Sequence, residues 1–142
     1  MNKRYYSLDL LKFDEINENR INSFNNYYEK LKPLQDKGFI ELPIIPDNCK
    51  HNGHMFYILV KDLDERNRLQ TYLRGHGIGS AFHYVPLHSS PEGLKVGRFV
   101  SNDENTTKVF ERLLRLPMYF NLSLEDINEV CIAIKEFYNQ NV

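Results

Sequence analysis

A strand–helix–strand pattern in the middle of the chain most constrains the fold. Residues 54–60 are apolar on both alternating faces, which predicts a strand that lies centrally in a sheet. Asp62 or Asp64 can cap a helix over residues 65–74, and glycines then end that helix. Residues 79–84 predict a second strand. Such a pattern requires a small sheet with helices packed on it, and it therefore predicts an α+β domain.

The N-terminal part of the chain predicts one long helix. Its apolar side chains recur mostly at three- and four-residue steps: Phe13, Ile16, Phe24, Tyr27, Leu31 and Leu34. Pro33 disfavours helical geometry at Lys32, so we expect the helix to end near these residues. A helix of this length overhangs a small domain. It either lies across the sheet, connects two domains, or forms part of a dimer interface.

The second half of the chain predicts a long loop and two further helices. Residues 85–102 contain prolines and show no periodicity, and loops of this length are often functional. Residues 104–114 predict a helix that Pro117 ends. Ser123 can cap a last helix. The apolar stripe of that helix comprises Ile127, Val130, Cys131, Ile134 and Phe137.

Length and charge exclude several classes of protein. With 142 residues, the chain is long enough for one domain with a core and too short for two. A formal net charge of -1 argues against nucleic acid or a membrane surface as the partner. No segment has the apolar length of a membrane span or a secretory signal. Two distant cysteines, Cys49 and Cys131, favour a reducing, cytoplasmic location.

The candidate binding residues gather where the second strand runs into the long loop. Among the five histidines, His83 and His88 flank Tyr84 within residues 82–91. Strand ends are places where crevices form, and these side chains can hydrogen-bond a phosphate or a sugar hydroxyl. The alternative is that they are two ordinary loop histidines and a packing tyrosine.

A metal site and a hydrolase site are weaker alternatives. His51 and His54 could join Cys49, but no second cysteine is near, and the spacing fits no standard zinc site. Ser89 or Ser90 could act as a nucleophile beside a histidine, but neither lies in a Gly-x-Ser-x-Gly motif. The chain also lacks a glycine-rich phosphate loop. We therefore expect no metal ligands and no catalytic nucleophile.

Three segments in register resemble one known family. They are residues 52–58 (NGHMFYI), 82–88 (FHYVPLH) and 112–123 (RLLRLPMYFNLS). Together they resemble the C-terminal part of the DegT/StrS family of pyridoxal-phosphate-dependent sugar aminotransferases, and the likeness runs from about residue 13 to residue 138. Three motifs in the correct order are far more specific than any one of them.

The resemblance implies a fold, an activity and an assembly. The fold would be the small C-terminal domain of a fold-type I aminotransferase, with a short, mostly antiparallel sheet. Residues 1–34 would form the helix that links it to a large domain, and residues 35–142 the small domain. Such enzymes use pyridoxal phosphate to transfer an amino group from glutamate to a nucleotide-linked sugar. Here the resemblance points to a dTDP-4-keto-6-deoxyhexose, and to a homo-oligomer, in the simplest case a dimer.

The large cofactor-binding domain of the family has no counterpart in this sequence. Lys61, Lys95 and Lys108 do not lie in the family's lysine motif. We therefore expect no catalytic or cofactor-binding residue here, no bound cofactor, and a fragment that is inactive alone. Residues 1–7 do not match the family, and a separately encoded large domain is possible. The alternative is a stand-alone binding or interaction module that keeps this fold.

Carried over by position, His83 and Tyr84 would hydrogen-bond the nucleotide-sugar substrate, with His88 as a further contact on the same loop. His54 would support that loop from the neighbouring strand. The linking helix would have lost part of its cover, so we also expect an exposed apolar strip and self-association.

Overall fold

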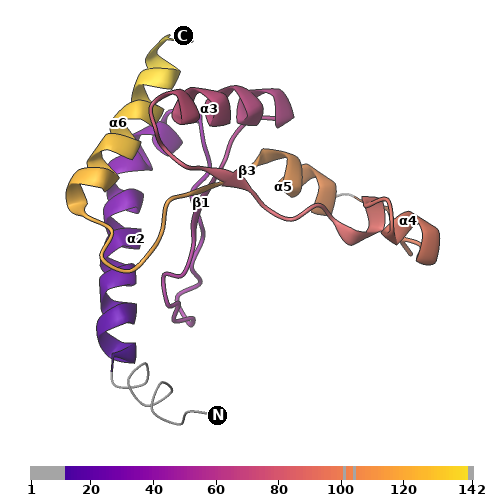
Figure 1. Ribbon diagram of the computed structural model, residues 1–142, viewed down its shortest axis with the longest axis horizontal. Helices are drawn as coiled ribbons and strands as arrows, with labels where there is room; N and C mark the ends of the chain where they lie inside the picture. Colours follow the sequence, from indigo (N-terminus) through magenta and orange to yellow (C-terminus); the bar gives the residue numbers. More distant parts are fainter. Residues whose placement is uncertain (1–11, 101, 104, 141–142) are drawn as a thin grey trace.

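The computed structural model of the chain describes residues 12–100, 102–103 and 105–140. Three antiparallel strands form a small sheet in the order β1-β3-β2, and helices pack against it (Figure 1). The elements in chain order are α2 (Phe13–Asp36), β1 (Phe56–Leu59), α3 (Leu63–Gly75), β2 (Ala81–Phe82), η1 (Leu87–Ser89), α4 (Gly93–Val96), α5 (Thr106–Arg112), β3 (Leu113–Leu116) and α6 (Leu124–Gln140). The predicted α+β class and the antiparallel sheet are confirmed.

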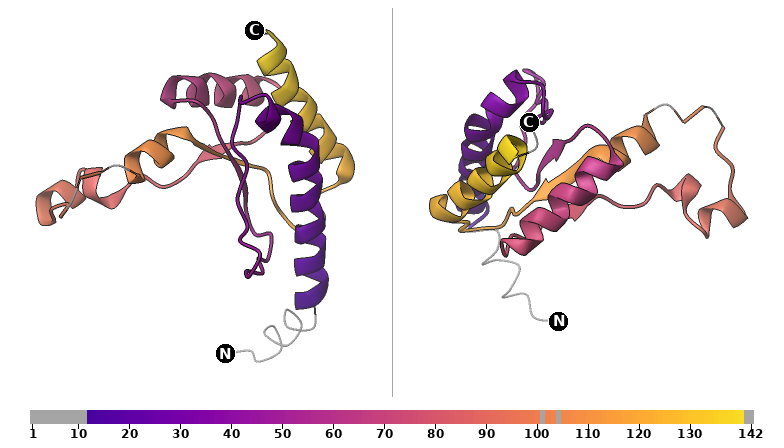
Figure 2. Two further views of the ribbon diagram at one scale, coloured as in Figure 1. Left: turned by 180° about the vertical axis from the view of Figure 1, so that it is seen from behind. Right: turned by 90° about the horizontal axis from the view of Figure 1, so that it is seen from above.

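The core lies on one face of the sheet. Because side chains alternate between the faces of a strand, Phe56 and Ile58 point into the core, where both are fully buried. Leu114 of β3 joins them, and helices α2, α3 and α6 cover this face (Figure 2). Tyr27 of α2 stacks on Phe56, with the ring centroids 5.0 Å apart. The opposite face of the sheet carries the partly exposed Tyr57, Ala81 and Arg115, together with the buried Leu113.

Strand β3 corrects the sequence-based prediction in two ways. Residues 113 and 114 were expected to end a helix, and β1 was expected to be the central strand. Residues 113–116 instead form the extended strand β3, which lies between β1 and β2. Leucine and arginine favour helices in isolation, but pairing on both edges satisfies the backbone of β3. β1 has instead a short bridge on its outer edge, where the Glu41 and Leu59 backbones exchange hydrogen bonds of 2.8 and 2.9 Å.

Helix α2 extends past the proline that was expected to end it. It continues to Asp36, although Pro33 cannot donate a backbone hydrogen bond. Burial of Leu34 holds this last turn against the core. The backbone N–H groups of Gly38 and Phe39 donate to Gln35 and Leu34 and close the helix end at 2.8 and 3.0 Å. Packing of the last turn therefore outweighs the tendency of Pro33 to end the helix.

Most of the apolar stripe of α2 is covered, contrary to the expected exposed strip. The helix packs alongside α6, and Phe24, Tyr27 and Leu31 are buried. Only the beginning of the stripe is open, where Phe13 is 58% exposed. Over most of its length, the apolar stripe of α2 is thus covered by the other elements of this small domain, and no second domain is needed to cover it.

The helix starts agree with the sequence. The Asp62 side chain accepts a hydrogen bond from the Glu65 backbone N–H at 2.9 Å, which fixes it rather than Asp64 as the cap of α3. The Ser123 hydroxyl likewise accepts from the Asp126 N–H at 3.0 Å at the start of α6. Both predicted caps are confirmed.

A protruding arm takes the place of the predicted loop. The segment that carries η1 and α4 extends away from the sheet between β2 and α5 (Figures 1 and 2). β2 itself is shorter than the predicted strand over residues 79–84. In the part of the chain that the structure describes, no helix has the length and apolar character needed to cross a membrane.

Candidate functional site

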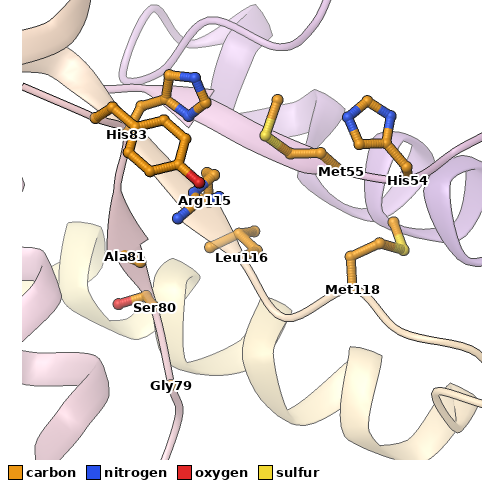
Figure 3. Close-up of a pocket in the computed structure, with 10 residues that line it drawn as sticks. His54, Met55, Gly79, Ser80, Ala81, His83, Arg115, Leu116 and Met118 are labelled. Atoms are coloured by element: carbon orange, nitrogen blue, oxygen red, sulfur yellow. The ribbon is translucent and has the colours of Figure 1, made fainter. Parts of the chain in front are cut away.

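An open cavity of about 610 Å³ lies on the uncovered face of the sheet (Figure 3). Segments from three places in the sequence line it: the entry to β1, the β2 segment, and β3 with the turn that follows. The lining residues are His54, Met55, Gly79, Ser80, Ala81, His83, Tyr84, Arg115, Leu116 and Met118. The cavity therefore exists only because the strands pair.

Strand register places Arg115 in the middle of this cavity. It pairs with Tyr57 of β1 on one side and with Ala81 of β2 on the other. Residues that pair directly share a face of the sheet, so all three project away from the core. Figure 3 shows the Arg115 side chain between the β2 segment and the residues at the entry to β1. The cavity thus has a cation in its floor.

His83 and Tyr84, which the sequence analysis grouped as candidate binding residues, both line this cavity. Their rings meet edge to face with centroids 5.1 Å apart, and Tyr84 is 78% exposed. The Arg115 guanidinium lies over the Tyr84 ring, 6.0 Å from its centroid. Both residues also border a second, mostly apolar cavity of about 340 Å³ beside Phe110. The pair can therefore offer polar atoms to a ligand with an apolar part.

His54 lines the same cavity from the β1 side. Its Nδ1 lies 3.0 Å from the Asn52 side-chain oxygen, and its backbone N–H donates to that oxygen at 3.2 Å. This double contact with Asn52 fixes the ring at the cavity edge. His54 is therefore placed to meet a ligand, while its hydrogen bonds stay within its own segment.

His88 does not line this cavity. It lies on η1 in the arm, where its Nε2 is 2.6 Å from Oδ2 of Asp103. The ring packs on Phe99, with a centroid distance of 4.4 Å. His88 thus joins two parts of the arm, and the structure separates it from the cavity that His83 and Tyr84 line.

Sequence reasoning missed Ser80 and Arg115. Ser80 precedes the short strand β2, and Arg115 directly follows the residues that were assigned to a helix. A signal was present in Leu113-Leu114-Arg115-Leu116, where one cation interrupts an apolar run. Read with the two-residue period of a strand, that run places the arginine on the face opposite Leu114 and Leu116.

The cavity does not fit a cofactor held on a lysine. Pyridoxal-phosphate enzymes bind their cofactor through a lysine side chain, and no lysine of the described ranges lines this cavity. No step of a reaction can therefore be derived through the cofactor at this place. Within the same ranges, no group of three or more His, Cys, Asp or Glu side chains could hold a metal ion.

The sequence profile of the DegT/DnrJ/EryC1/StrS aminotransferase family matches residues 7–135. The chain belongs to this family. Its members are pyridoxal-phosphate-dependent aminotransferases, and sugar aminotransferases are among its structural neighbours. Residues 1–7, which were predicted not to match the family, lie outside the described structure. The family match itself begins at residue 7.

Individual proteins resemble the chain over part of their length. The uncharacterized protein MJ1066 of Methanocaldococcus jannaschii is 28% identical, over 83% of this chain and 30% of that protein. The dTDP-3-amino-3,6-dideoxy-alpha-D-galactopyranose transaminase of Aneurinibacillus thermoaerophilus is 26% identical, over 92% of this chain and 34% of the enzyme. The chain thus spans about a third of the length of these relatives.

Solved structures in the family share the fold. DesV of S. venezuelae, in complex with a ketimine intermediate, matches with a TM-score of 0.82 and 23% identity, over 92% of this chain and 34% of DesV. The aminotransferase TlmJ of Streptoalloteichus hindustanus matches with a TM-score of 0.84 and 18% identity, over 96% of this chain and 35% of TlmJ. At these identities the likeness concerns the fold alone.

Proposed function

We propose that this chain is the small, substrate-facing domain of a sugar aminotransferase. The complete enzyme would transfer an amino group from glutamate to a dTDP-4-keto-6-deoxyhexose. The observation that supports this best is the cavity on the uncovered sheet face of a DegT/DnrJ/EryC1/StrS family member, with His83 and Tyr84 at its edge. Residues 35–142 would be the small domain and residues 1–34 its link to the remainder of the enzyme.

Each predicted site residue has a role in this proposal. His83 and Tyr84 hydrogen-bond the sugar or its diphosphate, and His54 contacts the ligand from the opposite side of the cavity. His88, already paired with Asp103, would meet only a ligand that extends along the arm. The apolar cavity beside Phe110 can take an apolar part of the ligand.

Alone, the chain should bind its substrate weakly and should not transaminate. The cavity is open and lacks a lysine among the described residues that line it, so a cofactor-bearing large domain must complete the site. That domain could be separately encoded. Both cysteines, Cys49 and Cys131, are free thiols, which supports the proposed cytoplasmic location.

Two measurements test the proposal. NMR titration of the labelled chain with a dTDP-sugar should shift the signals of His54, His83 and Tyr84, and shifts confined to other surfaces would contradict substrate binding here. Incubation with pyridoxal phosphate, borohydride reduction and mass spectrometry should find no stoichiometric adduct at a single lysine. One fully modified lysine would mean that the chain builds its own cofactor site, and it would overturn the fragment proposal.

Self-association is a further part of the proposal, and the arm supports it. Its most exposed apolar side chains are Leu87, Leu94, Val96 and Val100. Exposed apolar surface of this kind favours burial against another protein surface. Sedimentation velocity at micromolar concentration should show a dimer or larger oligomer, whereas a monomer at every concentration would count against it.

A further inference from the structure

The turn before β1 is anchored to α2 on both sides of Asn52. Before it, the His51 ring packs on Phe24 of α2, with the ring centroids 4.4 Å apart. After it, Gly53 has a φ of 60°, and a Cβ there would lie 2.7 Å from the backbone carbonyl of Arg20 in α2. The backbone around Asn52 is therefore held in place, and the contacts of its side chain are held with it.

The contacts between Asn52 and His54 identify which atoms donate. A backbone N–H can only donate, so the Asn52 side-chain atom 3.2 Å from the His54 backbone nitrogen must be the amide oxygen, Oδ1. That oxygen carries no hydrogen and can only accept. Nδ1 of His54 lies 3.0 Å from the same oxygen, so Nδ1 must carry the proton that it donates. In the neutral ring the other nitrogen, Nε2, is then unprotonated.

This unprotonated nitrogen is free to meet a ligand. His54 is exposed and lines the cavity on the sheet face (Figure 3), and its hydrogen bonds with the described residues involve only its backbone N–H and Nδ1. Arg115 on the floor of the same cavity has a guanidinium group, which can only donate hydrogen bonds. His54 thus adds a hydrogen-bond acceptor to a cavity in which Arg115 supplies donors.

We propose that Asn52 is a positioning residue that fixes the proton of His54 on Nδ1, so that Nε2 accepts a hydrogen bond from a ligand hydroxyl group in the cavity. Asn52 does not itself line the cavity in the described part of the chain, so it acts through His54. Without such a partner, a histidine side chain in water favours the opposite tautomer, with the proton on Nε2. The ligand part of the inference rests on the proposed function, because a nucleotide-sugar carries hydroxyl groups.

The test reads the tautomer of His54 directly. Long-range ¹H–¹⁵N NMR spectra of the full labelled chain, recorded at alkaline pH where imidazoles are neutral, show which ring nitrogen carries the proton. His54 should be mainly in the Nδ1–H form. Asn52→Ala should make Nε2–H the main form, whereas Asn52→Asp keeps an acceptor oxygen and should keep Nδ1–H. A main Nε2–H form in the unchanged chain, or no change in Asn52→Ala, overturns the proposal.

Asn48→Ala is the matched control for the loss of a loop asparagine. Asn48 is exposed in the same loop, and its side-chain oxygen contacts the thiol of Cys49. This variant should leave the tautomer of His54 unchanged. A switch to Nε2–H in Asn48→Ala as well would assign the effect to general loosening of the loop and would overturn the proposal. Unchanged backbone NMR spectra show that each variant has folded.

A dTDP-sugar separates this inference from the proposed function. On binding, the Nε2 signal of His54 should shift while Nδ1 keeps its proton, and Asn52→Ala should weaken binding by up to about tenfold, the usual effect of one hydrogen bond. In a His54→Ala chain, Asn52→Ala should weaken binding no further, because Asn52 acts through the ring. Binding that shifts Tyr84 but not Nε2 of His54 overturns this inference and leaves the proposed function standing. Absence of binding, with the Nδ1–H tautomer observed, overturns the proposed function and leaves the positioning by Asn52 standing.

Discussion

His88 and Asp103 connect the two ends of the protruding arm. Nε2 of His88 lies 2.6 Å from Oδ2 of Asp103, fifteen residues further along the chain. The same carboxylate accepts hydrogen bonds from Thr107 at the start of α5, from its backbone N–H at 3.1 Å and from its hydroxyl. These donors favour the ionised form, so they lower the pKa of Asp103 to about 2, with Thr107 as the larger cause and His88 as the smaller.

The first prediction concerns this pKa. Thr107→Val removes the hydroxyl donor at nearly constant volume, so the pKa of Asp103 should rise towards the ordinary value for aspartate. His88→Gln should raise the pKa less. NMR titration of the Asp103 carboxyl carbon measures both changes. A pKa that Thr107→Val leaves unchanged, or that His88→Gln raises more, would contradict this ranking of causes.

The lowered pKa also fixes the sign of a pH effect. A carboxyl group whose pKa is lower in the folded state stabilises that state above its ordinary pKa, and this contribution is lost on acidification. For Asp103 the loss should occur between about pH 4 and about pH 2. Protection of the arm's amides against hydrogen exchange, relative to the intrinsic rate at each pH, should fall in this interval, and it should fall less in Asp103→Asn, which cannot titrate. An equal fall in protection in both proteins would assign the effect to other groups.

A second prediction compares two glycines with left-handed backbone. Gly53 has a φ of 60°, and a Cβ there would lie 2.7 Å from the backbone carbonyl carbon and oxygen of Arg20 in α2. Gly38 has a φ of 77° and open space around it. Alanine at either site is strained, but only at Gly53 must it also push backbone aside. Gly53→Ala should therefore lower the free energy of unfolding by about 1–3 kcal/mol more than Gly38→Ala does.

Urea denaturation followed by circular dichroism measures this difference. Both variants keep the same change in side-chain size, so Gly38→Ala controls for the loss of glycine itself. Similar losses at the two positions would show that the loop before β1 does not pack rigidly against α2.

The third prediction concerns Arg112, whose side chain hydrogen-bonds the residues at the end of β1. Its Nε donates to the Val60 carbonyl oxygen at 2.7 Å, and a second nitrogen bonds the Glu41 carboxylate. Arg112→Met keeps much of the apolar stem but leaves the carbonyl of the buried Val60 without this donor. The free energy of unfolding should fall by about 1–3 kcal/mol.

Glu41→Gln serves as the comparison, because it removes only the exposed ion pair and should cost less than about 1 kcal/mol. Arg74→Met controls for loss of an exposed arginine and should be nearly neutral. Thermal or urea unfolding of the three variants ranks their losses of free energy of unfolding. A larger loss in Glu41→Gln than in Arg112→Met would assign the stabilisation to the ion pair.

The fourth prediction concerns the two thiols. Cys131 is buried in α6, and this burial raises the pKa of its thiol to about 11, whereas Cys49 is exposed. Because the thiolate is the reactive form, iodoacetamide at pH 8 should label Cys49 quickly and Cys131 only after unfolding. Mass spectrometry of tryptic peptides reads both sites. Rapid labelling of Cys131 in a folded Cys49→Ser variant would contradict the packing of α6.

The sequence alone determined the local features of this protein. Asp62 and Ser123 identify helix starts because a cap acts on a backbone N–H only three residues away. His83 and Tyr84 could be grouped because they are adjacent, and their position after a strand predicted a crevice. Motifs in the correct order indicated the family, and the profile match over residues 7–135 confirmed it.

Tertiary structure decided what depends on pairing between distant segments. Residues 113–116 became a strand because β1 and β2 satisfy their backbone from both sides, and local preference for a helix could not reveal that. Helix α2 passes Pro33 because the core buries Leu34. Arg115 faces the cavity beside Ala81 only through the register of β3, since a shift of one residue in register would turn its side chain to the other face of the sheet.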